Sequence, residues 1–221
     1  MADDFSVHLE TVARHLDHFA KDEAMAYCIG LLEEGALTVP LLYENVLAPA
    51  LNKIIVPRPQ EDRLIWREHA MTAIVRSIIE CARPYVMREK ERAGAKGSAG
   101  RVLLVCPEEE YHELGIRMGE DFFTIAGFET FFVGANTPQE NIVSAVETLR
   151  PDIVDIGVSN FLNLVQLKKI VAQLRQLIDA RVLIAVSGGA LVRSGKTAGD
   201  FNADILVNSF ADILALGEAR R

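Results

Sequence analysis

The sequence predicts an α/β protein in which a bundle of helices precedes a five-stranded, parallel, doubly wound sheet. Through residues 1–92, apolar residues recur at the spacing of amphipathic helices. After residue 100, short β-rich apolar runs alternate with helical stretches, which is typical of parallel strands covered by helices on both faces. Residues 93–100, small, flexible and partly charged, read as a linker. We therefore expect a helical domain at 1–92 and a doubly wound domain at 101–221.

The N-terminal part predicts four or five helices. In the first, the apolar positions are Phe5, Leu9, Val12, Leu16 and Phe19. Gly35 is suited to end a helix, and Pro40, Pro57 and Pro59 mark helix starts or breaks. The last helix is expected over 61–92, with Pro84 bending or dividing it.

The C-terminal part predicts five strands joined by helices with right-handed crossovers. The expected strands are 102–106, 131–134, 153–159, 182–187 and 205–208. The expected helices are 113–126, 138–149, 164–178, a weak one at 190–198, and 209–216.

Composition excludes several classes of function. Half of the 221 residues are apolar, and the net charge is 23 − 31 = −8 with no basic face, which disfavours binding to nucleic acid or to an anionic membrane. The three cysteines, Cys28, Cys81 and Cys106, are too few and too scattered for a disulfide framework or a zinc cluster. The N-terminus lacks the features of a signal peptide, and no apolar stretch approaches the ~20 residues of a membrane span. We expect a cytoplasmic protein without independent catalytic activity.

A candidate metal-ligand loop follows the first strand. The segment Glu110-Tyr111-His112-Glu113-Leu114-Gly115 comes directly after a buried apolar run, where open α/β sheets place their ligands. An imidazole with a carboxylate two residues before it is a suitable ligand for a transition metal. Small or polar residues follow the later strands at the same edge of the sheet, namely Gly134, Ser159, Gly188, Gly189 and Asn208.

These residues resemble the cobalamin-binding domain. The pattern of that family is Asp-x-His-x-x-Gly after the first strand, Ser at the end of the third and Gly-Gly at the end of the fourth. Here the matching residues are Glu110, His112 and Gly115, then Ser159, then Gly188 with Gly189. Residues 1–92 are similar to the helical cap that precedes this flavodoxin-like domain in methionine synthases, corrinoid methyl carriers and cobalamin-dependent photoreceptor regulators.

The resemblance implies that cobalamin, as adenosylcobalamin or methylcobalamin, binds with His112 as the lower axial ligand of cobalt. Glu110 would fix the tautomer of that imidazole and raise its basicity. The displaced nucleotide tail of the cofactor would lie near Ser159, Gly188 and Gly189. The full set of expected cofactor-binding residues in this domain is Glu110, Tyr111, His112, Glu113, Leu114, Gly115, Gly134, Ser159, Phe161, Gly188, Gly189 and Asn208.

Two residues of the cap are further candidates. Photoreceptors of this family place a Trp over the upper face of the corrin, ten residues before a Glu-His pair. Glu68 and His69 match the pair, but Arg58 stands at the position of the Trp, and Trp66 is too close. Trp66 is therefore either a cover for the upper face or a core residue, and His69 is a candidate upper ligand or contact.

Three functions are compatible with this resemblance. We favour a cobalamin-dependent sensor that acts through a protein partner, because Glu in place of Asp at 110 is frequent among the sensors. Its trigger would be light that breaks the cobalt–carbon bond, or exchange of the upper cobalt ligand. The alternative is a corrinoid methyl carrier for a methyltransferase system, and the third is a passive cobalamin store or chaperone. We also expect the protein to form a homo-oligomer.

Overall fold

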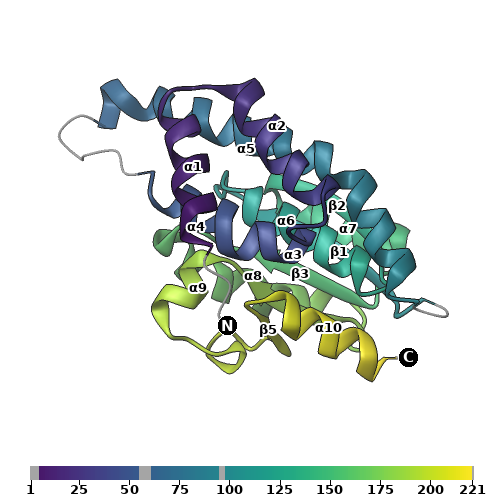
Figure 1. Ribbon diagram of the computed structural model, residues 1–221. Helices are drawn as coiled ribbons and strands as arrows, with labels where there is room; N and C mark the ends of the chain where they lie inside the picture. The colour runs from purple at the N-terminus through teal and green to yellow at the C-terminus, as the bar shows by residue number, and fades with distance from the viewer. Residues whose placement is uncertain (1–4, 55–60, 95–97, 221) are drawn as a thin grey trace. The chain divides into compact units, whose positions relative to one another are not determined.

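The computed structural model describes residues 5–54, 61–94 and 98–220 (Figure 1). The chain forms two compact units, residues 1–89 and 90–221. The predicted linker residues 95–97 and the predicted helix breakers Pro57 and Pro59 lie outside the described residues. Within the described part, none of the helices combines the length and apolar character needed to cross a lipid bilayer.

The first unit is entirely helical in its described part. Its elements are α1 (Ser6–Asp17), α2 (Lys21–Glu33), α3 (Val39–Leu42), the π-helix η1 (Tyr43–Leu47), α4 (Ala48–Asn52) and α5 (Glu61–Arg92). Gly35 follows α2 with φ +70°, the left-handed conformation expected of a residue beyond a helix end. The Thr38 hydroxyl accepts a hydrogen bond from the Leu41 N–H and so caps α3. Pro84 lies inside α5 without dividing it.

The second unit contains five strands, all parallel, as the sequence predicts. They are β1 (Arg101–Pro107), β2 (Glu129–Thr137), β3 (Ile153–Gly157), β4 (Leu183–Ser187) and β5 (Ile205–Val207). Their order in the sheet is β2-β1-β3-β4-β5. Strand β2 is longer at both ends than the predicted 131–134, so Gly134 lies inside the strand instead of at its carboxyl end.

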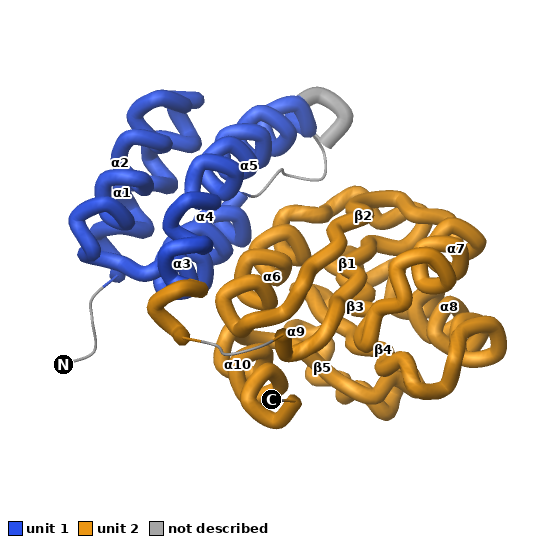
Figure 2. The backbone as a smooth tube through the Cα atoms, turned by 90° about the vertical axis from the view of Figure 1, so that its right-hand side faces the viewer, with its two compact units in different colours: residues 1–89 blue, residues 90–221 orange. Residues whose placement is uncertain are grey.

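Helices cover both faces of this sheet. They are α6 (Leu114–Ile125), α7 (Gln139–Leu149), α8 (Leu164–Leu177), α9 (Gly189–Ser194) and α10 (Phe210–Ala219), with the 3₁₀ turns η3 (Phe161–Asn163) and η4 (Ala198–Phe201). Figure 2 shows the sheet between α6 and α10 on one side and α7 and α8 on the other. The predicted weak helix at 190–198 is in fact the short α9 followed by η4.

Alternation along the strands assigns side chains to these two layers. Leu103, Val154 and Ile184 pack with α7 and α8 in one continuous apolar cluster. On the opposite face, Gly157 lies beneath α6, because a Cβ at this position would be 2.9 Å from Ile116 Cδ1. The strands are apolar on both faces, which explains why their sequences read as continuous apolar runs.

Candidate functional site

The carboxylate of Glu110 organises the loop between β1 and α6. Glu110 is fully buried, although it carries a charge. Its Oε1 accepts a hydrogen bond of 2.7 Å from His112 Nδ1 and one of 3.0 Å from the His112 backbone N–H. The imidazole is therefore held in one orientation by the carboxylate two residues before it.

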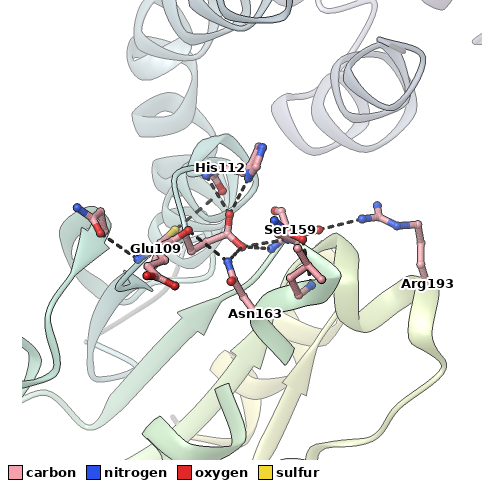
Figure 3. A network of polar contacts seen from close by, with 10 residues as sticks. Glu109, His112, Ser159, Asn163 and Arg193 are labelled. Atoms are coloured by element: carbon pink, nitrogen blue, oxygen red, sulfur yellow. Dashed lines mark hydrogen bonds and ion pairs between the residues drawn. The ribbon is translucent and has the colours of Figure 1, made fainter. Parts of the chain in front are cut away.

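The second oxygen of the same carboxylate binds the loop that follows β3. Oε2 accepts hydrogen bonds from the Ser159 N–H, the Asn160 N–H and Asn163 Nδ2, each of 3.0 Å. Figure 3 shows His112, Ser159 and Asn163 gathered around this point. Glu110 thus joins the loops after two adjacent strands at the carboxyl edge of the sheet.

The hydrogen bonds keep Glu110 ionised. Burial by itself would raise its pKa, but the donors from His112, Asn160 and Asn163 outweigh burial and lower the pKa to about 2. With the carboxylate accepting from Nδ1, the neutral imidazole of His112 carries its lone pair on Nε2. The His112 side chain is 55% exposed, so an imidazole oriented by a buried carboxylate is presented at the sheet edge.

Neighbouring loops are tied to the same segment. The Glu113 carboxylate accepts a hydrogen bond of 3.0 Å from the Ala135 N–H on β2. Gly134 has φ +96°, and a Cβ there would lie 3.0 Å from Glu113 Oε2. The N–H of Glu109 donates to Asn136 Oδ1, and the Asn136 N–H donates to the Glu110 carbonyl, both at 2.9 Å. The β1–α6 loop is therefore fixed against both neighbours of β1 in the sheet.

Ser159 and Phe161 lie next to Arg193 of α9. Arg193 Nη2 donates to the Ser159 carbonyl at 2.9 Å, and its guanidinium lies over the Phe161 ring, 5.2 Å from the centroid. Phe161 remains 48% exposed. Ser159 uses its backbone groups in these contacts, so its hydroxyl is not required to hold the loop.

Gly188 and Gly189 begin the turn into α9. Gly188 has φ +108°, and a Cβ there would lie 2.4 Å from the Val158 carbonyl oxygen, so only glycine fits. A Cβ at Gly189 would meet only the flexible end of Arg193, at 2.7 Å. The Gly-Gly pair therefore lets the loops after β3 and β4 approach each other closely.

Comparison with known proteins identifies this unit. Residues 100–209 match the family model described as the B12 binding domain. The chain belongs to the B12-binding family. Its cofactor is cobalamin, and the matched residues span all five strands of the second unit.

The fold matches that of a solved corrinoid protein. The monomethylamine corrinoid protein of Methanosarcina barkeri superposes with a TM-score of 0.74 at 14% identity, over 98% of this chain and 100% of that one. A cobalamin-binding protein from Desulfitobacterium hafniense DCB-2 has a TM-score of 0.47 at 17% identity, over 96% and 98%. The methanol:cobalamin methyltransferase complex MtaBC of Methanosarcina barkeri has 0.48 at 17%, over 94% and 77%. No curated protein sequence matches the chain.

The remaining predicted residues of the B12-binding domain surround the His112 loop or lie along the sheet edge. Tyr111 is 67% exposed, whereas Leu114 is buried at the start of α6 and Gly115 is exposed beside it. Asn208 is exposed before α10, and its N–H donates to Asp212 Oδ2 at 2.9 Å. The N–H of Asn208 therefore belongs to the cap of α10.

The two candidate cap residues, Trp66 and His69, lie on α5 of the helical unit. Trp66 packs against Phe19 with ring centroids 5.4 Å apart, and the Arg67 guanidinium lies 4.8 Å from the Phe19 ring. Trp66 nevertheless remains 53% exposed, so it is not a core residue. His69 is also exposed.

The contacts of two asparagines in this site were not predicted from the sequence. Asn163 supplies a donor to Glu110, and Asn136, with φ +51°, supplies both an acceptor and a donor. Asparagine is among the residues that tolerate a positive φ, as Asn136 has near the end of β2. Nothing in the local pattern links Asn163 to a carboxylate 53 positions earlier.

Proposed function

We propose that this chain is a corrinoid protein in which His112 coordinates cobalt from below and Glu110 holds the imidazole in place. The observation that carries the proposal is the buried carboxylate that accepts from His112 Nδ1 at 2.7 Å and from three donors of the β3–α8 loop. A carboxylate on the second ring nitrogen is the usual partner of a metal-ligating histidine. The buried end of this pair is fixed, and the imidazole end is accessible.

The chemistry of the donor set fits cobalamin. Imidazole is a good ligand for cobalt, and a single protein ligand is sufficient because the corrin ring supplies the equatorial nitrogens. In the proposed mode, Ser159, Gly188 and Gly189 contact the nucleotide tail of the cofactor.

We further propose that the protein carries methyl groups for a partner methyltransferase. Bound cobalamin supplies a cobalt centre that can accept and donate a methyl group. The support is analogy at the level of fold: the helical unit and the B12-binding domain together correspond to the complete monomethylamine corrinoid protein. This reverses the order of preference drawn from the sequence, which rested on the single difference between Glu and Asp at position 110.

The axial ligand can be tested by electron paramagnetic resonance of the Co(II) form. Protein labelled with nitrogen-15 is loaded with unlabelled cobalamin. Coordination by His112 predicts the two-line nitrogen splitting of nitrogen-15, and His112→Ala should lose it and bind cobalamin at least about tenfold more weakly. His69→Ala is the matched control and should keep the splitting. A three-line splitting from the unlabelled base of the cofactor would refute coordination by His112.

A light sensor is the second candidate, and the exposure of Trp66 is the observation that favours it. An aromatic side chain held by Phe19 and Arg67 is available to cover a corrin face. The discriminating measurement is size-exclusion chromatography of the adenosylcobalamin-loaded protein before and after green light. A carrier should keep its assembly state and accept a methyl group from a cognate methyltransferase. A light-dependent change in size would replace the carrier proposal by the sensor.

A further inference from the structure

A groove of about 350 Å³ on the second unit gathers lysine side chains. Residues 101–221 contain 11 Lys and Arg against 16 Asp and Glu, yet every lysine of this acidic stretch lines the groove. The lining residues come from the start of α8 and from the segment after α9, and they are Leu164, Val165, Lys168, Lys169, Lys196, Asp200 and Phe201.

The spacing along α8 explains how four of these residues share one face. Leu164 and Lys168 are four positions apart, and so are Val165 and Lys169, so each pair lies along the same side of the helix. Another face of α8 packs into the core with the buried residues Leu167, Ile170, Val171 and Leu174. The groove is therefore formed by a solvent-facing side of α8.

The bottom of the groove is apolar, and its rim is charged. Phe201 is only 3% exposed, whereas Val165 is 69% exposed beside it in the groove. Lys168, Lys169 and Lys196 are all exposed. An occupant that fits this distribution has an apolar group in the middle and negative charges around it.

The three lysines are not neutralised by the protein. Within the described residues, the side chains of Lys168, Lys169 and Lys196 form neither a hydrogen bond nor an ion pair. Asp200 is the one carboxylate among the lining residues, and its Oδ2 accepts from the N–H and the hydroxyl of Thr197 at 2.8 and 2.9 Å. Asp200 thus caps η4, and the groove keeps a surplus of two positive charges.

The open shape of the groove favours a segment of a protein as the occupant. Sites for small molecules usually enclose most of their ligand, whereas all the charged residues of this groove are exposed. Nucleic acid is a poor match, because it requires a larger basic surface than three lysines on an acidic domain. Acidic side chains of a partner protein complement the lysines, and one apolar side chain fills the space over Phe201.

The groove adjoins the loop that holds His112 in place. Asn163 donates to Glu110 Oε2 at 3.0 Å, and it directly precedes Leu164 of the groove. A partner anchored in the groove is therefore next to the carboxyl edge of the sheet, where the imidazole of His112 is presented.

We propose that this groove docks an acidic segment of a partner protein, with a Leu, Ile or Phe side chain over Phe201 and carboxylates paired with Lys168, Lys169 and Lys196. The proposal goes beyond the proposed function and does not depend on coordination of cobalt by His112. Exposed charge pairs of this kind accelerate association and select the partner, and the apolar side chain adds binding energy at the centre.

The test is selection of a random dodecapeptide library, displayed on phage, against the cobalamin-loaded protein. Peptides that bind the double variant Lys168→Glu with Lys196→Glu are removed first. The retained peptides should carry several Asp or Glu residues around a Leu, Ile or Phe. In fluorescence polarisation, their dissociation constants should rise at least about tenfold between roughly 50 mM and 500 mM salt.

Charge reversal assigns the binding to the groove. The double variant should bind the retained peptides at least about tenfold more weakly than the unaltered protein. Lys21→Glu, an exposed reversal of the same kind on α2, should bind them unchanged. All these proteins should bind cobalamin equally, and a loss of cobalamin binding confined to the double variant would assign the groove to the cofactor site and overturn the docking proposal.

Other occupants give different results. Retention of no peptides, or of peptides without acidic residues, would refute an acidic segment. Tighter binding of ADP, the small-anion probe, than of any retained peptide would assign the groove to a small anion. A dimer in size-exclusion chromatography that the double variant loses would assign it to a second copy of the chain. Failure of the unaltered protein to bind cobalamin would count against the proposed function alone, because the peptides can be selected without the cofactor.

Discussion

Glu110 and His112 are joined through a single oxygen: Glu110 Oε1 accepts from both the ring Nδ1 and the backbone N–H of His112. The two bonds fix the imidazole relative to its own backbone, so the direction of Nε2 depends on the carboxylate. Because Oε2 is bound by the β3–α8 loop, this direction is also tied to the position of β3.

Replacement of Glu110 by Gln should destabilise the folded protein. The amide of Gln has one acceptor oxygen where the carboxylate has two. Its NH2 group would therefore face N–H donors that one of the Glu110 oxygens accepts from in the unaltered protein. We expect the free energy of unfolding to fall by about 3 kcal/mol, since donors in a buried site lose their acceptor. Urea unfolding measures the loss. Glu108→Gln, an exposed change in the same loop, is the control and should stay within about 0.5 kcal/mol.

Removal of the Asn163 amide should destabilise the protein less than its replacement by a carboxylate. Its Nδ2 donates to Glu110 Oε2 at 3.0 Å, and the side chain is buried. Asn163→Ala removes one of several donors and should cost about 1 kcal/mol. Asn163→Asp places a second carboxylate against the first and should cost more at neutral pH than at about pH 4. Equal stability of the two variants at neutral pH would contradict the assigned hydrogen bond.

Gly188 should not accept a side chain. Gly188 has φ +108°, and a Cβ on it would lie 2.4 Å from the Val158 carbonyl oxygen. Gly188→Ala therefore forces the backbones of the β3–α8 and β4–α9 loops apart. We expect a loss of at least about 3 kcal/mol in unfolding free energy and weaker cobalamin binding. Gly195 has φ +64° with nothing within 4 Å of a Cβ, so Gly195→Ala carries the cost of the conformation alone, about 1 kcal/mol.

Periodicity in the sequence was sufficient to predict the architecture. The strands are buried on both faces, so they read as apolar runs, and the five-stranded parallel sheet is confirmed. Their ends were harder to place: β2 continues through Gly134 to Thr137 because Asn136 and Ala135 bind groups of the β1–α6 loop. Pro84 stays within α5 although a proline usually ends or bends a helix.

The site was predictable where it follows a local motif and not where it depends on tertiary contacts. Spacing alone linked Glu110 to His112, and their hydrogen bond is present in the structure. The donors of Ser159, Asn160 and Asn163 come from a loop about 50 residues later, and a backbone N–H leaves no trace in a sequence. In the sequence, Asp155 is one polar residue in an apolar strand, and only the structure shows that it is buried on the same face of the sheet as Ser187.

Asp155 should make the protein less stable as the pH rises. Burial raises its pKa from 3.8 to about 7, against a small opposing effect of Ser187. Between these values the folded state keeps the proton that the unfolded chain releases. The free energy of unfolding attributable to this group is therefore highest below about pH 4 and declines until about pH 7, by on the order of 4 kcal/mol in total.

Asp155→Asn removes this dependence, so the free energy of unfolding of the variant relative to the unaltered protein should rise by about 3 kcal/mol between about pH 5 and pH 8. Urea unfolding at both pH values measures the difference, with Glu147→Gln as the exposed carboxylate control. A constant difference between Asp155→Asn and the unaltered protein would show that the carboxyl is ionised in the folded state throughout this range.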